Sequence, residues 1–208
     1  GVTGSGKTEI YIHLIAEALA RGGDVLLLVP EIAITAQLIA RLERIFGSRV
    51  TAYHSKLTLA RRTESYLRLT RSDGGELVVG ARSALFLPLR HLQLIVVDEE
   101  HDTGYKQTDA QPRYNARDVA VVMARLREAR TVLGSATPSL ESYANALSGK
   151  YGLATLDERY GDARPRLDGP LPPLQRDAHL PQARPPPPMP LLRPRRNRPR
   201  PLSGVQGR

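Results

Sequence analysis

The sequence predicts an α/β fold in which a parallel sheet lies between layers of helices. Two short apolar runs, VLLLV at 25–29 and LIVV at 94–97, are typical of parallel strands that are covered on both faces. Between such strands the apolar residues recur with helical spacing, which indicates amphipathic helices. Strands and helices of these lengths, alternating along the chain, favour a three-layer arrangement with a parallel sheet in the middle.

Each element has a local signal. The predicted strands are residues 25–29, 50–53, 77–79, 94–97 and 131–133, with a last strand at 150–153. The predicted helices are residues 9–21, 35–46, 59–70 and 115–127. The first helix places Ile10, Leu14 and Ile15 on one stripe and ends at Gly22-Gly23, a pair typical of a helix C-terminus.

The positive charge of the chain is concentrated at its C-terminal end. The net charge is +9, but residues 164–208 hold ten Arg, no Lys and two Asp, which is a net of +8. Residues 1–163 therefore hold 20 basic and 19 acidic residues, a net of +1. Because the body is nearly neutral, the overall charge does not indicate that it binds nucleic acid.

Proline divides the chain at the same place, since 13 of the 17 prolines follow Arg164. We therefore expect a folded domain at 1–163 and a disordered tail at 164–208. Three interpretations of the tail remain open: a solvated basic linker, a nucleic-acid-binding arm, or an out-of-frame translation of GC-rich coding DNA.

The composition also limits the class of protein. The chain has no cysteine, which excludes a disulfide framework and a thiolate metal site. No apolar run approaches the ~20 residues that span a bilayer, and the first residues do not resemble a secretory leader. The expectation is a cytoplasmic protein without a membrane partner.

A phosphate-binding loop opens the chain. Its residues are Gly1, Val2, Thr3, Gly4, Ser5, Gly6, Lys7 and Thr8, which match the pattern G-x4-G-K-[ST]. Glycines let the backbone amides wrap around phosphate oxygens, and the following helix points its positive dipole end at the anion. This pattern predicts ATP binding, with Lys7 on the β- and γ-phosphates and Thr8 on Mg²⁺.

A chance glycine-rich loop is the competing interpretation, and the amphipathic helix behind the loop disfavours it. A phosphate-binding loop normally follows a buried strand, so we expect the domain to be truncated at its N-terminus.

An acidic cluster follows the strand at 94–97. The carboxyl ends of parallel strands form the edge where α/β proteins bind ligands, which places Asp98 and Glu99 at that edge. The sequence predicts that Asp98 holds Mg²⁺ together with Thr8, and that Glu99 acts as the general base on the attacking water. His101 is predicted to link this site to other segments by hydrogen bonds, with a plain surface histidine as the alternative.

A third motif, GSATPS, follows the strand at 131–133. Ser135, Ala136 and Thr137 are predicted to have a coupling role, because the two hydroxyls can hydrogen-bond to the acidic cluster or to the surroundings of the γ-phosphate. The competing interpretation is a helix cap, since Pro138 and Ser139 are suited to begin a helix.

These motifs in this order resemble the first motor lobe of the PriA family of replication-restart DNA helicases. GVTGSGKTE, LVPEI, GARSALF, VDEEHD and GSATPS carry the resemblance, which extends from Gly1 to about Asp162. It implies a RecA-like P-loop NTPase lobe of a 3′→5′ DNA helicase that uses ATP and Mg²⁺. It also implies single-stranded and forked DNA, other primosome proteins and single-stranded-DNA-binding protein as partners.

The resemblance further implies DNA contacts in two segments. These residues are Arg82 and Ser83 in GARSALF, and Tyr105, Lys106, Arg113 and Tyr114 in a loop that resembles the family's single-stranded-DNA sensor. Tyrosines can stack on bases and basic side chains can meet phosphates. An ordinary turn and a polar surface loop are the competing interpretations, and Pro112 stands where many family members carry an aromatic residue.

The chain departs from the family in three respects. It has no counterpart of the family's zinc-binding cysteines, N-terminal DNA-binding domain or second motor lobe. No zinc is therefore expected, and the fragment alone should bind ATP·Mg weakly without unwinding DNA. Two further readings remain open: a non-enzymatic remnant whose Arg/Pro-rich tail binds nucleic acid, and a different P-loop ATPase.

Overall fold

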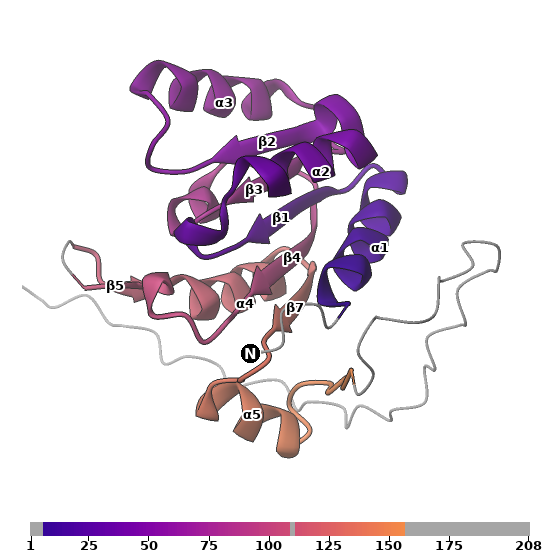
Figure 1. Ribbon diagram of the computed structural model, residues 1–208, viewed down its shortest axis with the longest axis vertical. Coiled ribbons are helices and arrows are strands. Elements are labelled where there is room, and N and C mark those ends of the chain that lie inside the picture. Colours follow the sequence, from indigo (N-terminus) through magenta and orange to yellow (C-terminus); the bar gives the residue numbers. More distant parts are fainter. Residues whose placement is uncertain (1–5, 109–110, 157–208) are drawn as a thin grey trace, which may run out of the picture. The chain divides into compact units, whose positions relative to one another are not determined.

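The computed structural model describes residues 6–108 and 111–156, and its centre is a five-stranded, fully parallel sheet (Figure 1). The strands are β1 (Asp24–Leu28), β2 (Val50–Tyr53), β3 (Leu77–Gly80), β4 (Leu92–Asp98) and β7 (Arg130–Gly134). Their order in the sheet is β2-β3-β1-β4-β7, so β1 lies between β3 and β4. This confirms the predicted α/β fold with a parallel sheet.

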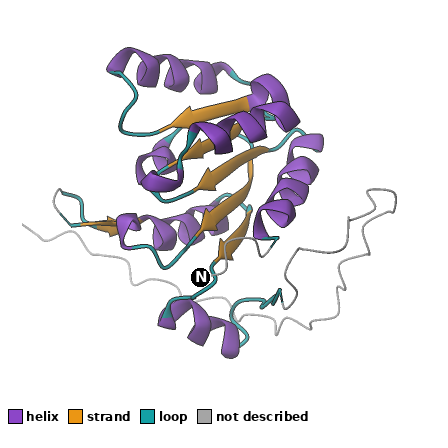
Figure 2. Ribbon diagram, viewed as in Figure 1, coloured by secondary structure: helices purple, strands orange, loops and turns teal. Residues whose placement is uncertain are grey.

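Helices cover both faces of the sheet (Figure 2). Helices α1 (Lys7–Ala20) and α2 (Ala36–Phe46) contribute to the core on one face, and α3 (Leu59–Arg71) and α4 (Ala116–Leu126) to the core on the other. A fifth helix, α5 (Leu140–Leu147), follows β7 and has no buried residue. Strand β1 shows the two layers, because Val25 and Leu27 pack with α1 and α2 while Leu26 and Leu28 pack with α4. All five of its residues are buried. The apolar run predicts this for Val25–Leu28, and the buried Asp24 accepts hydrogen bonds from the amides of Glu76 and His91.

Polar side chains define where several helices begin. Thr35 accepts a hydrogen bond from the Leu38 amide at 3.2 Å, and Asn115 accepts one from the Arg117 amide at 3.0 Å. Both residues are therefore N-caps of α2 and α4 and not the first residues of the predicted helices. The prediction was one residue early because apolar spacing does not separate a cap from the helix that it precedes.

Short elements connect the main ones. The 3-10 turns are η1 (Glu31–Ala33), η2 (Gly47–Arg49), η3 (Arg82–Phe86) and η4 (Thr103–Tyr105). Two-residue strands β5 (Lys106–Gln107) and β6 (Tyr114–Asn115) pair antiparallel and form a small ribbon before α4. Most of these connections lie at the carboxyl edge of the sheet, where the predicted site residues also lie.

The predicted strand at 150–153 is wrong. The amides of Lys150 and Tyr151 both donate to the carbonyl of Asn145, so these residues complete the C-terminal end of α5. Residues 1–5, the predicted tail at 164–208 and the predicted boundary after Ala163 lie outside the described residues. Within the described part, no helix is long and apolar enough to cross a bilayer.

Truncation of a core side chain should measure how strongly this sheet depends on its packing. Leu28 is fully buried beside Val97 in the core on the α4 side. We expect Leu28→Ala to lower the free energy of unfolding by about 2–5 kcal/mol, because it removes apolar contacts and leaves a cavity. Leu126→Ala, at a position that is 79% exposed, should change it by about 0.5 kcal/mol at most. Urea unfolding measures both, and equal losses would contradict the described core.

Candidate functional site

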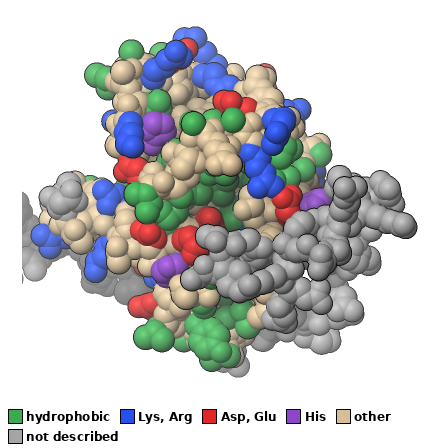
Figure 3. Space-filling view, viewed as in Figure 1, with side chains coloured by type: hydrophobic (Ala, Val, Ile, Leu, Met, Phe, Trp, Pro, Cys, Tyr) green, Lys and Arg blue, Asp and Glu red, His purple; other side chains and the backbone are tan. Residues whose placement is uncertain are grey.

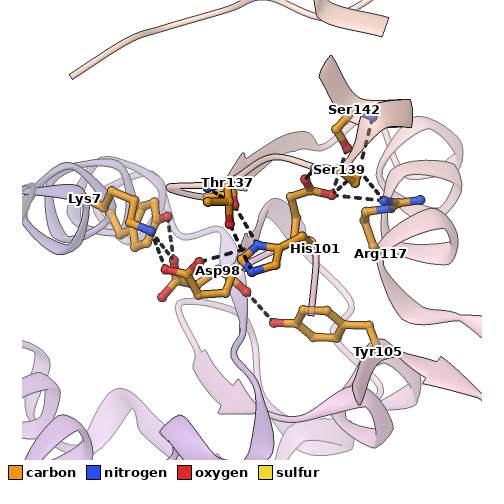
Figure 4. Close-up of polar contacts among 12 residues, drawn as sticks. Lys7, Asp98, His101, Tyr105, Arg117, Thr137, Ser139 and Ser142 are labelled. Atoms are coloured by element: carbon orange, nitrogen blue, oxygen red, sulfur yellow. Dashed lines mark hydrogen bonds and ion pairs between the residues drawn. The ribbon is translucent and has the colours of Figure 1, made fainter. Parts of the chain in front are cut away.

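The first turn of α1 faces the end of β4. The Nζ atom of Lys7 lies 2.5 Å from Oε1 of Glu99 and 3.8 Å from Oδ1 of Asp98 (Figure 4). Residues about 90 positions apart in the sequence are thus in direct contact, as the order of the two motifs predicts. The contact is partly buried, since the Lys7 side chain is 18% exposed and that of Glu99 is 35% exposed.

Gly6 precedes this helix with a left-handed backbone, at a φ of 75°. Glycine adopts such a φ without strain, and the turn leaves the amides at the start of α1 available for an anion. Thr8 lies in the first turn of α1, next to Lys7. The other residues of the predicted loop, 1–5, lie outside the described residues.

The donor atoms fit the predicted magnesium ion. Carboxylate and hydroxyl oxygens, as in Asp98 and Thr8, are the hard ligands that Mg²⁺ prefers. No group of three or more His, Cys, Asp or Glu side chains in the described ranges could cage a metal. Mg²⁺ usually takes one or two protein ligands and completes its shell with phosphate oxygens and water.

Glu99 has an unusual backbone for a residue other than glycine. Its φ is 46°, in the left-handed region, directly after the last residue of β4. Strained backbone of this kind is concentrated at functional sites. The conformation turns the chain sharply at the edge of the sheet, where the Glu99 side chain meets Lys7.

His101 contacts the third motif from both nitrogens of its ring. Nδ1 lies 2.7 Å from the Ser135 hydroxyl and Nε2 lies 3.3 Å from the Thr137 hydroxyl (Figure 4). Nδ1 also lies 3.6 Å from Oε2 of Glu99. The structure therefore brings the predicted coupling residues together, with the exposed Ala136 between the two hydroxyls. Their coupling role stays a prediction.

Glu100 forms a buried polar cluster that the sequence analysis missed. Its side chain is 1% exposed and accepts hydrogen bonds from the Ser139 amide at 2.6 Å and the Ser142 hydroxyl at 2.9 Å. The Arg117 guanidinium donates to it at 3.1 Å (Figure 4). Burial alone would raise the pKa of the Glu100 carboxyl, but these donors outweigh burial and hold the pKa below its ordinary value. Glu100 belongs to the VDEEHD motif, but the sequence does not show that its side chain is buried or which donors it contacts.

The helix-cap interpretation of GSATPS is also right for its last residue. Ser139 caps α5, because its hydroxyl accepts from the Ser142 amide at 3.2 Å. The motif thus serves two purposes, with Ser135 and Thr137 on His101 and Ser139 at the helix start.

Two tyrosines hold Asp98 from different sides. Tyr11 on α1 donates its hydroxyl hydrogen to Oδ1 of Asp98 at 2.9 Å, and Tyr105 donates to the main-chain carbonyl of Asp98 at 2.7 Å. Tyr105 was expected to stack on a DNA base, but its ring is only 1% exposed, so no face is open to a base. That expectation is corrected: the Tyr105 hydroxyl holds the main chain of Asp98.

The other predicted DNA residues lie on a neighbouring surface. Arg82 donates from its guanidinium to the carbonyl of Lys106 at 3.0 Å, which ties η3 to the ribbon of β5 and β6. The Tyr114 ring packs edge-on against Phe86, with ring centroids 5.3 Å apart. Lys106 and Arg113 are exposed, and Ser83 is half-buried in η3. The structure places these side chains near one another, and their contact with DNA stays a prediction.

Most arginines of the body lie elsewhere. Helix α3 carries Arg61, Arg62, Arg68 and Arg71, and basic side chains gather over it at the top of Figure 3. Arg61 and Arg68 are paired with Glu64 and Glu76. This surface is a mixed-charge face and offers no second candidate site.

A parallel sheet whose carboxyl edge brings Lys7 to Asp98 and Glu99 is the arrangement of a RecA-like helicase lobe. The sequence profile of the DEAD/DEAH box helicase family matches residues 1–146, and the chain belongs to that family.

Within it, the chain is homologous to the replication restart protein PriA. It is 50% identical to PriA of Chlamydia trachomatis over 165 residues, which are 79% of this chain and 22% of that protein. It is 52% identical to PriA of Rickettsia conorii over 160 residues, 77% of this chain and 24% of that protein. The chain thus spans about a quarter or less of the length of these relatives. The solved structure of the helicase MrfA bound to DNA matches with a TM-score of 0.48 and 20% sequence identity. The match covers 71% of this chain and 22% of that chain. This likeness is too weak to carry functional information.

Neutralising Glu100 should destabilise the fold and change its response to acid. We expect Glu100→Gln to lower the free energy of unfolding by about 3 kcal/mol near pH 7, because Arg117 would lose its buried partner. Since the folded-state pKa of Glu100 is lowered, the charged carboxylate stabilises the fold above the unfolded-state pKa of about 4.3. That contribution is lost as the pH falls through the folded-state pKa, so the two proteins should converge in acid.

Urea unfolding of both proteins from pH 3 to pH 7 measures this difference. Glu43→Gln is the control, because that side chain is exposed on α2 and is not part of the Glu100 cluster. A difference between wild type and Glu100→Gln that does not shrink as the pH falls would rule out the charged network as its cause.

Proposed function

We propose that the chain is the ATP·Mg-binding lobe of a 3′→5′ DNA helicase that acts in replication restart. The contact of Lys7 with Glu99 and Asp98 supports this proposal, because these residues are the ones proposed to bind phosphate, to act as general base and to hold magnesium. The PriA relatives support the replication-restart assignment.

Each residue then has a chemical role. Lys7 contacts the β- and γ-phosphates, and the start of α1 adds its amides to the same anion. Bound Mg²⁺ would offset phosphate charge, with Asp98 and Thr8 as its protein ligands. Glu99 orients the attacking water and accepts its proton, and His101 transmits the state of the site to Ser135 and Thr137.

The 208 residues alone should bind ATP·Mg weakly and turn it over slowly. Charge that develops on the phosphates in the transition state normally needs an arginine from the facing lobe, which contributes several orders of magnitude in rate. A single lobe also has no second body against which to open and close, so we propose no strand separation by these residues alone.

The DNA-facing surface in this proposal is the ribbon beside η3. Lys106 and Arg113 are exposed and suited to phosphates, with Arg82, Ser83 and Tyr114 behind them. Single-stranded and forked DNA are the proposed ligands. Primosome proteins and single-stranded-DNA-binding protein are the proposed partners of the longer protein, and the cytoplasm is its proposed compartment.

Binding of a fluorescent ATP analogue tests the nucleotide site. We expect saturable, Mg²⁺-dependent binding by the wild-type chain and at least tenfold weaker binding by Lys7→Ala, since the ammonium supplies the main charge for the phosphates. Lys150→Ala removes an exposed lysine after α5 and should bind like the wild type. Equal affinities of wild type and Lys7→Ala, with circular dichroism spectra unchanged, would reject the assignment of the site.

A second candidate function is nucleic-acid binding by the basic tail, favoured by the net charge of +8 in residues 164–208. Salt titrations of single-stranded DNA binding distinguish it from binding by the ribbon. If the ribbon binds DNA, Lys106→Ala with Arg113→Ala should lower the salt slope by about 0.7 for each lost phosphate contact. Loss of all binding on deletion of 164–208, with no effect of the two substitutions, would support the tail instead.

A further inference from the structure

Tyr11 is a polar residue in an apolar environment. It lies one turn after Lys7 on α1, its side chain is 5% exposed, and its ring packs in the core with Ile15 and Val96. Helical spacing alone assigns it to the core. Its hydroxyl nevertheless leaves that core and donates to Oδ1 of Asp98 at 2.9 Å.

The neighbouring strand leaves room for this hydroxyl. Asp98 of β4 is the register partner of Gly134 of β7. A Cβ atom on Gly134 would lie 1.6 Å from the Tyr11 hydroxyl, which no pair of atoms tolerates. The glycine that begins GSATPS is therefore needed for the tyrosine to reach Asp98, an observation independent of the hydrogen bond.

The two oxygens of Asp98 have different surroundings. Oδ1 receives the Tyr11 hydroxyl, and Lys7 lies 3.8 Å from the same oxygen. Oδ2 takes part in neither of these two contacts.

We propose that Tyr11 is a positioning residue for the magnesium-binding carboxylate. By holding Oδ1, it fixes the orientation of Asp98 and directs Oδ2 toward the metal. This role rests on the proposed ATP·Mg binding by the same site. A fixed carboxylate loses less conformational freedom when the metal binds, so the hydrogen bond raises metal-dependent affinity without contacting the nucleotide.

Tyr11→Phe tests the proposal, because phenylalanine keeps the packed ring and removes only the hydroxyl. Binding of the fluorescent ATP analogue is measured with Mg²⁺ and again with EDTA. We expect the Mg²⁺-dependent affinity to fall by about tenfold, as for loss of a hydrogen bond to a charged group. Affinity in EDTA should change less than about twofold, since Lys7 and the start of α1 are unaltered.

Two further variants separate positioning from general stability. Gly134→Ala keeps the tyrosine in the sequence but displaces the end of its ring with the hydroxyl, so it should produce the same metal-selective loss. Tyr105→Phe removes the hydrogen bond to the main chain of Asp98 and not to its carboxylate. It should change the affinities with Mg²⁺ and with EDTA by the same factor.

Three outcomes would overturn the inference. Equal losses in Mg²⁺ and EDTA for Tyr11→Phe would mean that the tyrosine only packs, and tighter binding with Mg²⁺ would mean that it competes with the metal. Unchanged affinity in both conditions would remove any role for the hydroxyl. Failure of the wild-type chain to bind the analogue at all would reject the proposed function itself, which is a distinct result.

Discussion

The buried charge of Glu100 is the constraint on which the site depends. A carboxylate that is 1% exposed must be compensated, and its donors come from the start of α4 through Arg117 and from the start of α5 through Ser139 and Ser142. One side chain therefore fixes two helices against the end of β4. Any shift of α5 relative to the strand would leave a charge buried without its partners.

The same anchoring explains the strained residue beside it. Asp98 is held by Tyr11 and Tyr105, and the Glu100 amide donates to the carbonyl of Gly134 at 3.0 Å. Glu99 connects these two fixed points and takes the left-handed φ of 46°. Such a backbone costs of the order of 1–3 kcal/mol, which neighbouring contacts must offset. The strained residue is Glu99, the proposed general base, and its backbone conformation directs the side chain toward Lys7.

The sequence predicted those parts of the fold and site that have local patterns. Continuous apolar runs identified β1 and β4. The order of the motifs GSGKT, DEEH and GSAT predicted one site at the carboxyl edge of the sheet, where Lys7, Glu99 and His101 do lie. Contacts that depend on packing had no such pattern. Tyr11 has the spacing of a core residue and Tyr105 lies in a polar loop, so only the three-dimensional arrangement shows that both reach Asp98. The strand predicted at 150–153 is wrong for the same reason, because the amides of Lys150 and Tyr151 donate to a carbonyl in α5.

The ion pair between Lys7 and Glu99 gives the site two possible charge arrangements. In the present one, the ammonium neutralises the carboxylate at a contact of 2.5 Å. A phosphate group would compete for the same ammonium, and it carries more negative charge than one carboxylate. Glu99 would then lose its cation and gain freedom to accept a proton from water, with His101 already 3.6 Å from its other oxygen. In the proposed mechanism, phosphate binding and activation of Glu99 would be linked through Lys7, and the contacts of His101 with Ser135 and Thr137 would carry that exchange to the third motif.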